Sequence, residues 1–526
     1  MTQGLNRDEM ISQLSEEFDV LVVGGGASGL GVAVDAASRG YRTALLEAHD
    51  FAKATSSRST KLVHGGVRYL EQLNFSLVTE ALRERGRLYL NAPHMVTNLA
   101  FVVPRYKWWE GPFYGIGLKL YDMLARKLNI EHSKQLNKQA TIEVIPNVQQ
   151  DGLQGGVMYH DGQFDDARMA IALARTTADH GGVVANRVAV TGLLKTDGHV
   201  SGVTARDEIS GKEFEVRARV VVNATGIFSD SVRKMDDSDA MTMIEPAQGV
   251  HLVFDASFGP GDAAIMVPHT DDGRVLFVIP WHDRVLVGTT DTAMKHADLE
   301  PRPLADEIEF ILRNAARYMQ KDPTRDDVLA VYAGQRPLVH KGGTEGSSKS
   351  ISRSHEVVVS ESGLVSIMGG KWTTYRQMAE DTMSHAITVG GLSESPCVTT
   401  DLHLHGWMDR DDPEMPADHV RRQYGSDAKA LDALAAERPE LAAPIHDGLP
   451  YRGAEFAWAA RNEMALTIED ALARRTRSLL LNAEASIEAA PLVASIMAKE
   501  LGKDAAWEAE QVSEYETLAR GYQLPS

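Results

Sequence analysis

The chain has 526 residues, of which 43% are hydrophobic and 24% are charged, as in a soluble globular enzyme of two or three domains. A formal net charge of −19 excludes nucleic acid as the main partner, because phosphate binding needs a clustered positive surface. The single cysteine, Cys397, excludes an intramolecular disulfide and a cysteine-based metal site, so we expect no metal and a reducing, cytoplasmic location.

The amino-terminal segment predicts neither secretion nor a membrane span. Residues 1–15 lack an apolar core of signal-peptide length and already carry charged side chains. The least polar stretch, Val20 to Val34, is flanked by Asp19 and Asp35 and is shorter and richer in glycine than a spanning helix. Any membrane contact must therefore be local.

A β-α-β unit is predicted near the start of the chain. Phe18 to Val23 is an apolar, β-branched run, Ser28 to Ser38 has helical character, and Tyr41 to Glu47 again reads as a strand. Parallel strands joined by a helix imply a doubly wound sheet, with a ligand beyond the carboxyl ends of its strands.

The turn after the first strand has the dinucleotide-binding spacing. Gly24, Gly26 and Gly29 match G-x-G-x-x-G, and Glu47 ends the second strand. The glycines allow the tight turn, the approach of the pyrophosphate to the backbone and the packing of helix on strand. An acid at Glu47 suits ribose hydroxyls and disfavours a 2′-phosphate, so FAD and NAD both stay open and NADP is disfavoured.

The later β-like runs are scattered, which predicts a discontinuous cofactor domain. The run that ends in VVVNATG at 220–226 carries small residues that let a backbone pass close to a ligand, although a plain strand and turn would look the same. The runs are Val183 to Leu194, Val216 to Val222, Arg274 to Ile279, Val285 to Gly288 and Val357 to Met368.

The carboxyl-terminal part changes character. Lys341 to Ser350 is rich in Gly, Ser and Lys and predicts an exposed loop. Gly390 to Pro416 interrupts the pattern, and Ala417 to Tyr522 is rich in Ala, Glu, Arg and Leu. We therefore expect a separate helical domain after the break.

One long motif is highly specific. Residues 54–70 read ATSSRSTKLVHGGVRYL, which resembles the segment that runs from the FAD pyrophosphate to the flavin ring in the FAD-dependent glycerol-3-phosphate dehydrogenases. The similarity spans most of the chain. Supporting motifs are DDAR at 165–168, FVIPW at 277–281, GTTD at 288–291, GQRPL at 334–338, GGKWTTYR at 369–376, TIED at 467–470 and RRTR at 474–477.

Two positions depart from the family pattern. Gly-Ile-Phe at 226–228 stands where Gly-Pro-Trp is usual, and Gln335 stands where a smaller or aliphatic residue is usual. Both bear on local flavin or substrate geometry. The soluble glycerol-3-phosphate oxidases resemble the chain nearly as well but commonly carry an insertion that is not seen here, which favours the dehydrogenase.

The resemblance implies an α/β fold with three parts. These are a discontinuous, Rossmann-like FAD-binding domain (1–95, 150–240 and 350–390), an inserted α+β substrate-binding cap domain (96–149 and 241–349) and an all-helical C-terminal domain (391–526). The FAD-binding residues that it implies are Gly24, Gly26, Ser28, Gly29, Glu47, Ser56, Ser57, Thr60, Lys61, His64, Val188, Ala224, Gly226, Gly370, Lys371, Thr373 and Thr374.

The implied reaction is hydride transfer from C2 of sn-glycerol 3-phosphate to FAD, which gives dihydroxyacetone phosphate. Arg336 and Arg353 would hold the phosphate, because the guanidinium fork suits a dianion, although surface salt bridges are the alternative. Arg68 and Tyr69 would reach the substrate hydroxyls or the developing ketone. Lys371 would stabilise negative charge near the flavin, or else is a solvated loop residue.

His251 is our candidate for the proton acceptor. The family places a histidine facing the substrate at this point, and imidazole titrates near working pH. A hydrogen-bonded structural histidine is the alternative. The catalytic residues that we expect are thus His251, Arg68 and Lys371, while His64 is expected to contact the flavin.

The family passes electrons to membrane quinone, so a docking surface is expected. Arg105 to Lys127 combines basic side chains with tryptophan, phenylalanine and tyrosine, as a monotopic contact requires. The alternative is an amphipathic helix packed on the cap domain. We expect a peripheral protein at the inner face of the cell membrane, and a homodimer is compatible with the sequence.

Two other functions compete with this hypothesis. An oxidase of the same fold would use O2 and release peroxide, or accept another small hydroxy or amino acid as electron donor. A flavin-binding scaffold would use the acidic helical domain as an interaction surface, but it would have no need for Arg68, Arg336, Arg353 and Lys371 together.

Overall fold

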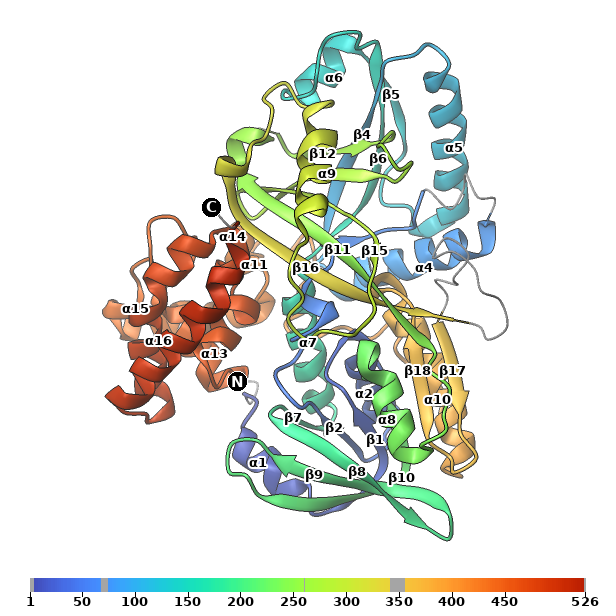
Figure 1. The fold of residues 1–526 in the computed structure, drawn as a ribbon, viewed down its shortest axis with the longest axis vertical. Coiled ribbons are helices and arrows are strands. Elements are labelled where there is room, and N and C mark those ends of the chain that lie inside the picture. The colour runs from blue at the N-terminus through green and yellow to red at the C-terminus, as the bar shows by residue number, and fades with distance from the viewer. Residues whose placement is uncertain (1–3, 68–73, 260, 341–354, 525–526) are drawn as a thin grey trace.

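The computed structural model describes residues 4–67, 74–259, 261–340 and 355–524 (Figure 1). Two sheets and a helical carboxyl-terminal unit make up this part of the chain. In Figure 1 the first sheet lies at the bottom, the second sheet at the top and the helical unit, in red, at the left. The loop expected at Lys341 to Ser350 lies outside the described residues.

The first sheet contains the predicted β-α-β unit. β1 (Glu17–Val23) pairs in parallel with β2 (Thr43–Leu46), and α2 (Ala27–Ser38) connects them, which confirms the prediction. Val20 and Val22 join a core on the helix side, while Leu21 and Val23 join a core on the other side. This burial of both faces explains why the strand is a continuous apolar run.

The rest of the first sheet comes from distant parts of the chain, as the scattered β-like runs predict. β10 and β2 flank β1 in parallel, and β18 pairs in parallel with β10. The strand order is β17-β18-β10-β1-β2-β7, with β8 and β9 attached through β10. The bounds are β7 (Val183–Ala185), β8 (Val188–Thr196), β9 (His199–Asp207), β10 (Glu213–Asn223), β17 (His355–Val359) and β18 (Val365–Gly369).

Helices cover the first sheet. α2 packs between α7 (Asp166–Asp179) and α10 (Tyr375–Val389), so residues far apart in sequence share one apolar core. Two smaller helices also contact this sheet, α1 (Arg7–Gln13) at β7 and α8 (Ser229–Asp236) at β8, β10 and β18.

The second sheet is mixed and is built mainly from residues 97–163 and 244–339. Its order is β15-β11-β14-β13-β12-β4-β6-β3, with β16 on β11 and β5 on β6. The strands are β3 (Leu62–Val63), β4 (Thr97–Arg105), β5 (Lys134–Asn137), β6 (Gly155–Gln163), β11 (Ile244–Asp255), β12 (Ala263–Val267), β13 (Leu276–Trp281), β14 (Arg284–Gly288), β15 (Thr292–Ala293) and β16 (Val328–Val339). The associated helices are α4 (Phe75–Asn91), α5 (Glu110–Ala125), α6 (Lys138–Val144) and α9 (Ala305–Ala316).

The strand β6 does not belong to the sheet that the expected domain boundary near residue 150 implies. β6 falls within residues 150–240, which the sequence assigns to the FAD-binding part, yet it pairs with β3, β4 and β5 in the second sheet. The segment therefore contributes to both sheets, and the chain crosses between them after Gln163 rather than near residue 150.

The helical unit confirms the all-helical expectation for the carboxyl-terminal part. Its elements are α11 (His419–Arg422), α12 (Ala428–Glu437), α13 (Gly453–Asn462), a π-helical turn at Asp470–Arg475, α14 (Ser478–Leu481), α15 (Ala483–Leu501) and α16 (Ala505–Ala519). Leu472 and Leu479 belong to the same buried cluster as Trp281 and Tyr332 of the second sheet. The unit is thus packed into the body of the protein. Within the described residues, no helix is both long and apolar enough to cross a membrane.

Candidate active site

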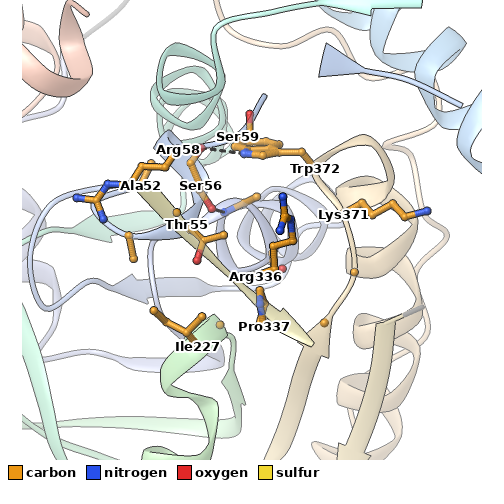
Figure 2. A pocket seen from close by; sticks show the side chains of 18 of the residues that line it. Ala52, Thr55, Ser56, Arg58, Ser59, Ile227, Arg336, Pro337, Lys371 and Trp372 are labelled. Carbon is orange, nitrogen blue, oxygen red and sulfur yellow. Dashed lines mark hydrogen bonds between the residues drawn. The ribbon is translucent and has the colours of Figure 1, made fainter. Parts of the chain in front are cut away.

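A cavity of about 640 Å³ lies where the carboxyl ends of four parallel strands meet the second sheet (Figure 2). The segments directly after β1, β2, β10 and β18 line it, at Gly24–Ser28, Glu47, Ala224–Gly226 and Gly370–Lys371. This is the predicted position for a ligand of a doubly wound sheet, and the volume suits a small-molecule site.

The glycine turn shapes the dinucleotide end of the cavity. Gly24 has φ +110° and lies against the Ala224 carbonyl, and a Cβ at Gly29 would lie 1.9 Å from the Gly24 oxygen. Neither position can accept a side chain without displacing the backbone. α2 begins beside the cavity, where the Ala27 N–H donates to Ser56 Oγ at 2.9 Å. A helix N-terminus at a glycine turn is the arrangement that binds a pyrophosphate.

Glu47 stands at the expected ribose position. Its Oε2 accepts the Gly25 N–H at 2.6 Å and its Oε1 accepts the His49 N–H at 2.8 Å. Burial raises the pKa of the Glu47 carboxyl, and these two hydrogen bonds oppose the rise. Each oxygen keeps a lone pair for a hydroxyl group.

The segment 55–64 follows one wall of the cavity, but only some of its predicted contacts face it. Ser56, Thr60 and His64 line the cavity. Lys61 instead is fully buried behind it, where Nζ donates to both Asp166 oxygens at 2.8 Å and to the Ser57 carbonyl at 2.7 Å. Burial lowers the pKa of Lys61 to about 7, against the opposing charge of Asp166. The side chains of Lys61 and Ser57 are therefore not brought into the cavity.

The turn after β18 closes on this segment. Trp372 Nε1 donates to the Ser56 carbonyl at 2.9 Å, a bond drawn in Figure 2, and the His64 N–H donates to Thr373 Oγ1 at 3.2 Å. Gly370, Lys371 and Thr373 line the cavity, whereas Thr374 does not. Val188, Ala224 and Gly226 also line it, so their predicted segments do meet there.

His251 lies on β11 at the wall formed by the second sheet. Its Nε2 is 3.0 Å from Thr60 Oγ1, and its ring stacks on Tyr332 with 4.8 Å between centroids. Gly288 faces it, and a Cβ there would lie 2.3 Å from His251 Cδ2. Burial, with lesser contributions from Lys61 and Arg336, holds the pKa of His251 well below its usual value. The imidazole is therefore neutral across the physiological range.

Arg336 lies on β16 and extends into the middle of the cavity in Figure 2. Its guanidinium donates to the Thr290 carbonyl and to Asp291 Oδ1 at 3.2 Å, and its side chain is 32% exposed. Lys371 also lines the cavity, but its amine is directed away from Arg336 in this view. The predicted partners Arg68, Tyr69 and Arg353 lie outside the described residues.

Some functional contacts were not predicted. Tyr332 supports His251, and Asp291 pairs with Arg336. Asp291 lies in a motif quoted above, but that motif gives no sign of the partner, because the pairing depends on the sheet. Of the two departures from the family pattern, Ile227 lines the cavity, whereas Gln335 is buried on the opposite side of β16 and accepts the Asp298 N–H at 2.8 Å.

Comparisons with known proteins agree over the whole chain. Residues 19–376 match a family model described as FAD dependent oxidoreductase, and residues 364–508 match the C-terminal domain of alpha-glycerophosphate oxidase. The mitochondrial glycerol-3-phosphate dehydrogenase of Rattus norvegicus is 41% identical over 97% of this chain and 74% of its own length. That of Schizosaccharomyces pombe is 37% identical over 95% and 87%.

Solved structures give the same result. The glycerol-3-phosphate dehydrogenase of Bacillus halodurans complexed with FAD is similar at a TM-score of 0.80 and 30% identity, over 100% of this chain and 99% of that one. The L-alpha-glycerophosphate oxidase of Mycoplasma pneumoniae with FAD bound matches at a TM-score of 0.57 and 18% identity, over 75% of this chain and 100% of its own, which shows a shared fold alone.

Proposed function

The chain belongs to the family of FAD-dependent glycerol-3-phosphate dehydrogenases, and on this premise we propose that it oxidises sn-glycerol 3-phosphate to dihydroxyacetone phosphate. Bound FAD would supply the redox chemistry by accepting the C2 hydride, and membrane quinone would take up the electrons. The observation that carries the proposal is that Arg336 and a buried, neutral His251 line the same cavity as the glycine turn.

The residues present fit FAD. Gly24 and Gly29 leave no room for side chains at the turn, Glu47 offers lone pairs to a ribose, and four strand ends open onto one continuous cavity. The cavity also extends well beyond the turn to the second sheet, as a ligand with a second ring system requires.

Arg336 would anchor the phosphate. Its guanidinium is held by Asp291 and by the Thr290 carbonyl, so it is oriented before the substrate arrives and loses little freedom on binding. A planar fork that faces a dianion forms strong, charge-assisted hydrogen bonds. Lys371 would have to turn from its present direction to reach the product oxygen, which its flexible stem permits.

His251 would accept the proton of the C2 hydroxyl. We assign this role to Nε2, because Nδ1 is buried and has no hydrogen-bond partner among the described residues, whereas the Thr60 hydroxyl bonded to Nε2 lines the cavity. A base that stays neutral at working pH is available in every turnover.

The donor is tested by anaerobic bleaching of the flavin. Purified holoenzyme is mixed with glycerol 3-phosphate, glycerol, glycerol 2-phosphate and 3-phosphoglycerate, and the flavin absorbance is followed. Rapid bleaching by sn-glycerol 3-phosphate alone is expected. Bound flavin that this compound leaves oxidised would overturn the proposal.

The acceptor is tested by reoxidation. Reduced enzyme is mixed with a soluble quinone analogue or with air-saturated buffer, and peroxide is measured in parallel. We expect fast reoxidation by the quinone and little peroxide. Stoichiometric peroxide with slow quinone reduction would instead assign the chain as an oxidase.

A surface on α5 supports docking of the enzyme on a membrane. Trp109, Phe113, Ile116 and Met123 recur at helical spacing and are 40%, 52%, 72% and 73% exposed, next to Trp108 at 78%. The opposite face of α5 is buried. The alternative of an amphipathic helix packed on the cap domain therefore accounts for that face but not for the exposed apolar side chains. Lys107, Lys119, Arg126 and Lys127 are exposed around the apolar stripe. Apolar side chains ringed by cations suit an anionic lipid surface.

Vesicle co-sedimentation tests this surface. Charge reversal at Lys119, Arg126 and Lys127 should release the protein from vesicles that contain anionic lipid, while flavin reduction by the substrate stays unchanged. The matched control reverses three exposed lysines elsewhere, Lys212, Lys429 and Lys503. Equal binding by both variants would refute the α5 surface.

A further inference from the structure

The segment 50–61 has one side on the cavity and the other on the helical unit. Ala52 to Ser56 and Arg58 to Thr60 line the cavity. From behind, residues of the helical unit contact the segment along its length. The cofactor wall is thus supported by residues more than 400 positions later in the sequence.

Charged side chains make most of these contacts. Asp50 accepts hydrogen bonds from Arg474 Nε at 2.6 Å and from Arg475 at 2.7 and 2.8 Å. Lys53 pairs with Glu469, and Arg58 donates to Tyr522 Oη at 3.1 Å. These arginines hold the pKa of Asp50 far below its usual value, so the carboxylate is charged at every working pH.

Arg477 makes the contact nearest to the reacting groups. It donates to the Ser57 carbonyl at 2.6 Å and to the Ala473 carbonyl at 2.9 Å, and its side chain is 1% exposed. Its guanidinium also lies 3.4 Å from Asp166 and 3.7 Å from Asp165.

Ser57 lies in sequence between Ser56 and Thr60, which both line the cavity. Ser56 Oγ accepts the Ala27 N–H at the start of α2, and Thr60 Oγ1 is bonded to Nε2 of His251. The Ser57 carbonyl accepts from both Arg477 and Lys61, and the Ser59 N–H donates to Asp166 at 2.8 Å. A displacement of this peptide would therefore move Ser56 and Thr60 together.

We propose that Arg477 of the helical unit is a positioning residue of the cofactor site, which acts through the Ser57 carbonyl on Ser56 at the pyrophosphate and on Thr60 at His251. The helical unit is then a structural part of the redox site rather than an appended interaction module. The expected effect of Arg477 on kcat rests on the proposed function, whereas its expected effect on FAD binding does not.

The geometry demands an arginine. Two carbonyls, from Ser57 and Ala473, are satisfied by two separate nitrogens of one rigid guanidinium. A lysine carries the same charge on a single nitrogen, so both carbonyls would have to converge on one point instead of bonding the two separate nitrogens that hold them now.

The test compares Arg477→Met and Arg477→Lys with the matched control Arg175→Met. Arg175 is an equally buried arginine that pairs with Asp427 of the helical unit, away from the segment 50–61. For each holoenzyme we measure the FAD dissociation constant by flavin fluorescence, the melting temperature, and kcat and KM for glycerol 3-phosphate.

Both methionine variants should have a lower melting temperature than the wild type, because each substitution removes a buried cation from an ion pair. Only Arg477→Met should also bind FAD on the order of tenfold or more weakly and lose kcat with KM little changed, since a hydrogen bond to a charged partner is worth about a decade in affinity. Arg477→Lys should fall between Arg477→Met and the wild type.

If Arg477→Met does not fold, the Arg477→Lys variant still tests whether Arg477 positions the cofactor site. A folded Arg477→Lys protein with the FAD dissociation constant and kcat of the wild type would overturn the proposal, as would flavin loss of equal size in Arg175→Met. Because FAD binding is measured without substrate, failure here is distinguishable from failure of the proposed donor.

Discussion

At its dinucleotide end the cavity is shaped by a glycine turn, and at its second-sheet end it is lined by side chains, among which His251 and Arg336 are the polar groups of the proposed reaction. Gly24, Gly29 and the start of α2 come from one short stretch of chain. His251 and Arg336 come from β11 and β16, which are neighbours only because the sheet pairs them. The first end depends on the absence of side chains, the second on the placement of a few.

This difference predicts two kinds of failure. Added atoms at the dinucleotide end should abolish cofactor binding, whereas removed atoms at the second-sheet end should leave the cofactor bound and impair the reaction. The four predictions below test the contrast, from the largest expected effect to the smallest.

Gly29→Ala should yield protein without flavin. The new Cβ would lie 1.9 Å from the Gly24 carbonyl oxygen, so the turn must move away from the pyrophosphate, and we expect FAD affinity to fall roughly 100-fold or more. Absorbance of the purified protein measures bound flavin. Gly117→Ala on α5 is the control, because its Cβ would meet nothing within 4 Å. Normal flavin content in Gly29→Ala would contradict the tight turn.

The Arg336→Met variant should bind FAD as the wild type does but bind the substrate more weakly. Removal of the guanidinium deletes charge-assisted hydrogen bonds to the phosphate, so KM should rise about tenfold to 100-fold with an unchanged flavin spectrum. Steady-state kinetics with a quinone analogue provide the measurement. The control is Arg317→Met, an exposed arginine paired with Asp271. An unaltered KM would remove Arg336 from the phosphate site.

Thr60→Val should slow flavin reduction by about tenfold, as expected for the loss of one hydrogen bond that orients a proton acceptor. The substitution keeps the shape of the side chain and removes the hydroxyl bonded to His251 Nε2. Anaerobic stopped-flow bleaching at saturating substrate reports the step, and FAD affinity should change little. A rate equal to that of the wild type would exclude the Thr60 hydroxyl from proton transfer.

Between pH 6 and pH 8 the same rate should not fall as the pH is lowered, and any change in this window should be a loss as the pH rises, when Lys61, whose pKa burial lowers to about 7, gives up its proton. The pKa of His251 is lowered far below the usual value for histidine, so the ring stays neutral and able to accept a proton throughout this window and is protonated only at much lower pH. If the proton acceptor were an ordinary histidine, half of its imidazole would be protonated near pH 6.5, and the rate of flavin reduction would fall by half there. A loss of rate toward low pH with a midpoint near 6.5 in stopped-flow bleaching would contradict the buried environment of His251.

The same contrast explains how much could be predicted from the sequence. The β-α-β unit, the turn at Gly24 and the position of Glu47 follow from local periodicity and spacing, and the family resemblance supplied FAD and the three-part architecture. The direction of the Lys61 side chain, away from the cavity, could not be predicted because a motif assigns residues to a segment but not to one of its faces. β6 was not predicted, and its place in the second sheet could not be foreseen because strand pairing is nonlocal. Tyr332 left no signal, and the RRTR motif at 474–477 gave no sign of the partner of Arg477, since both partners lie far away in sequence.

The central strand β1 of the first sheet has a consequence for biosynthesis. Its partner β10 comes from residues 213–223, so one edge of a strand that ends in the apolar run Val20 to Val23 has no hydrogen-bonding neighbour until some 190 further residues have been made. At typical elongation rates this interval is roughly 10 to 40 s. During that time the nascent chain presents an open strand edge, which is a template for aggregation until the far side of the sheet arrives.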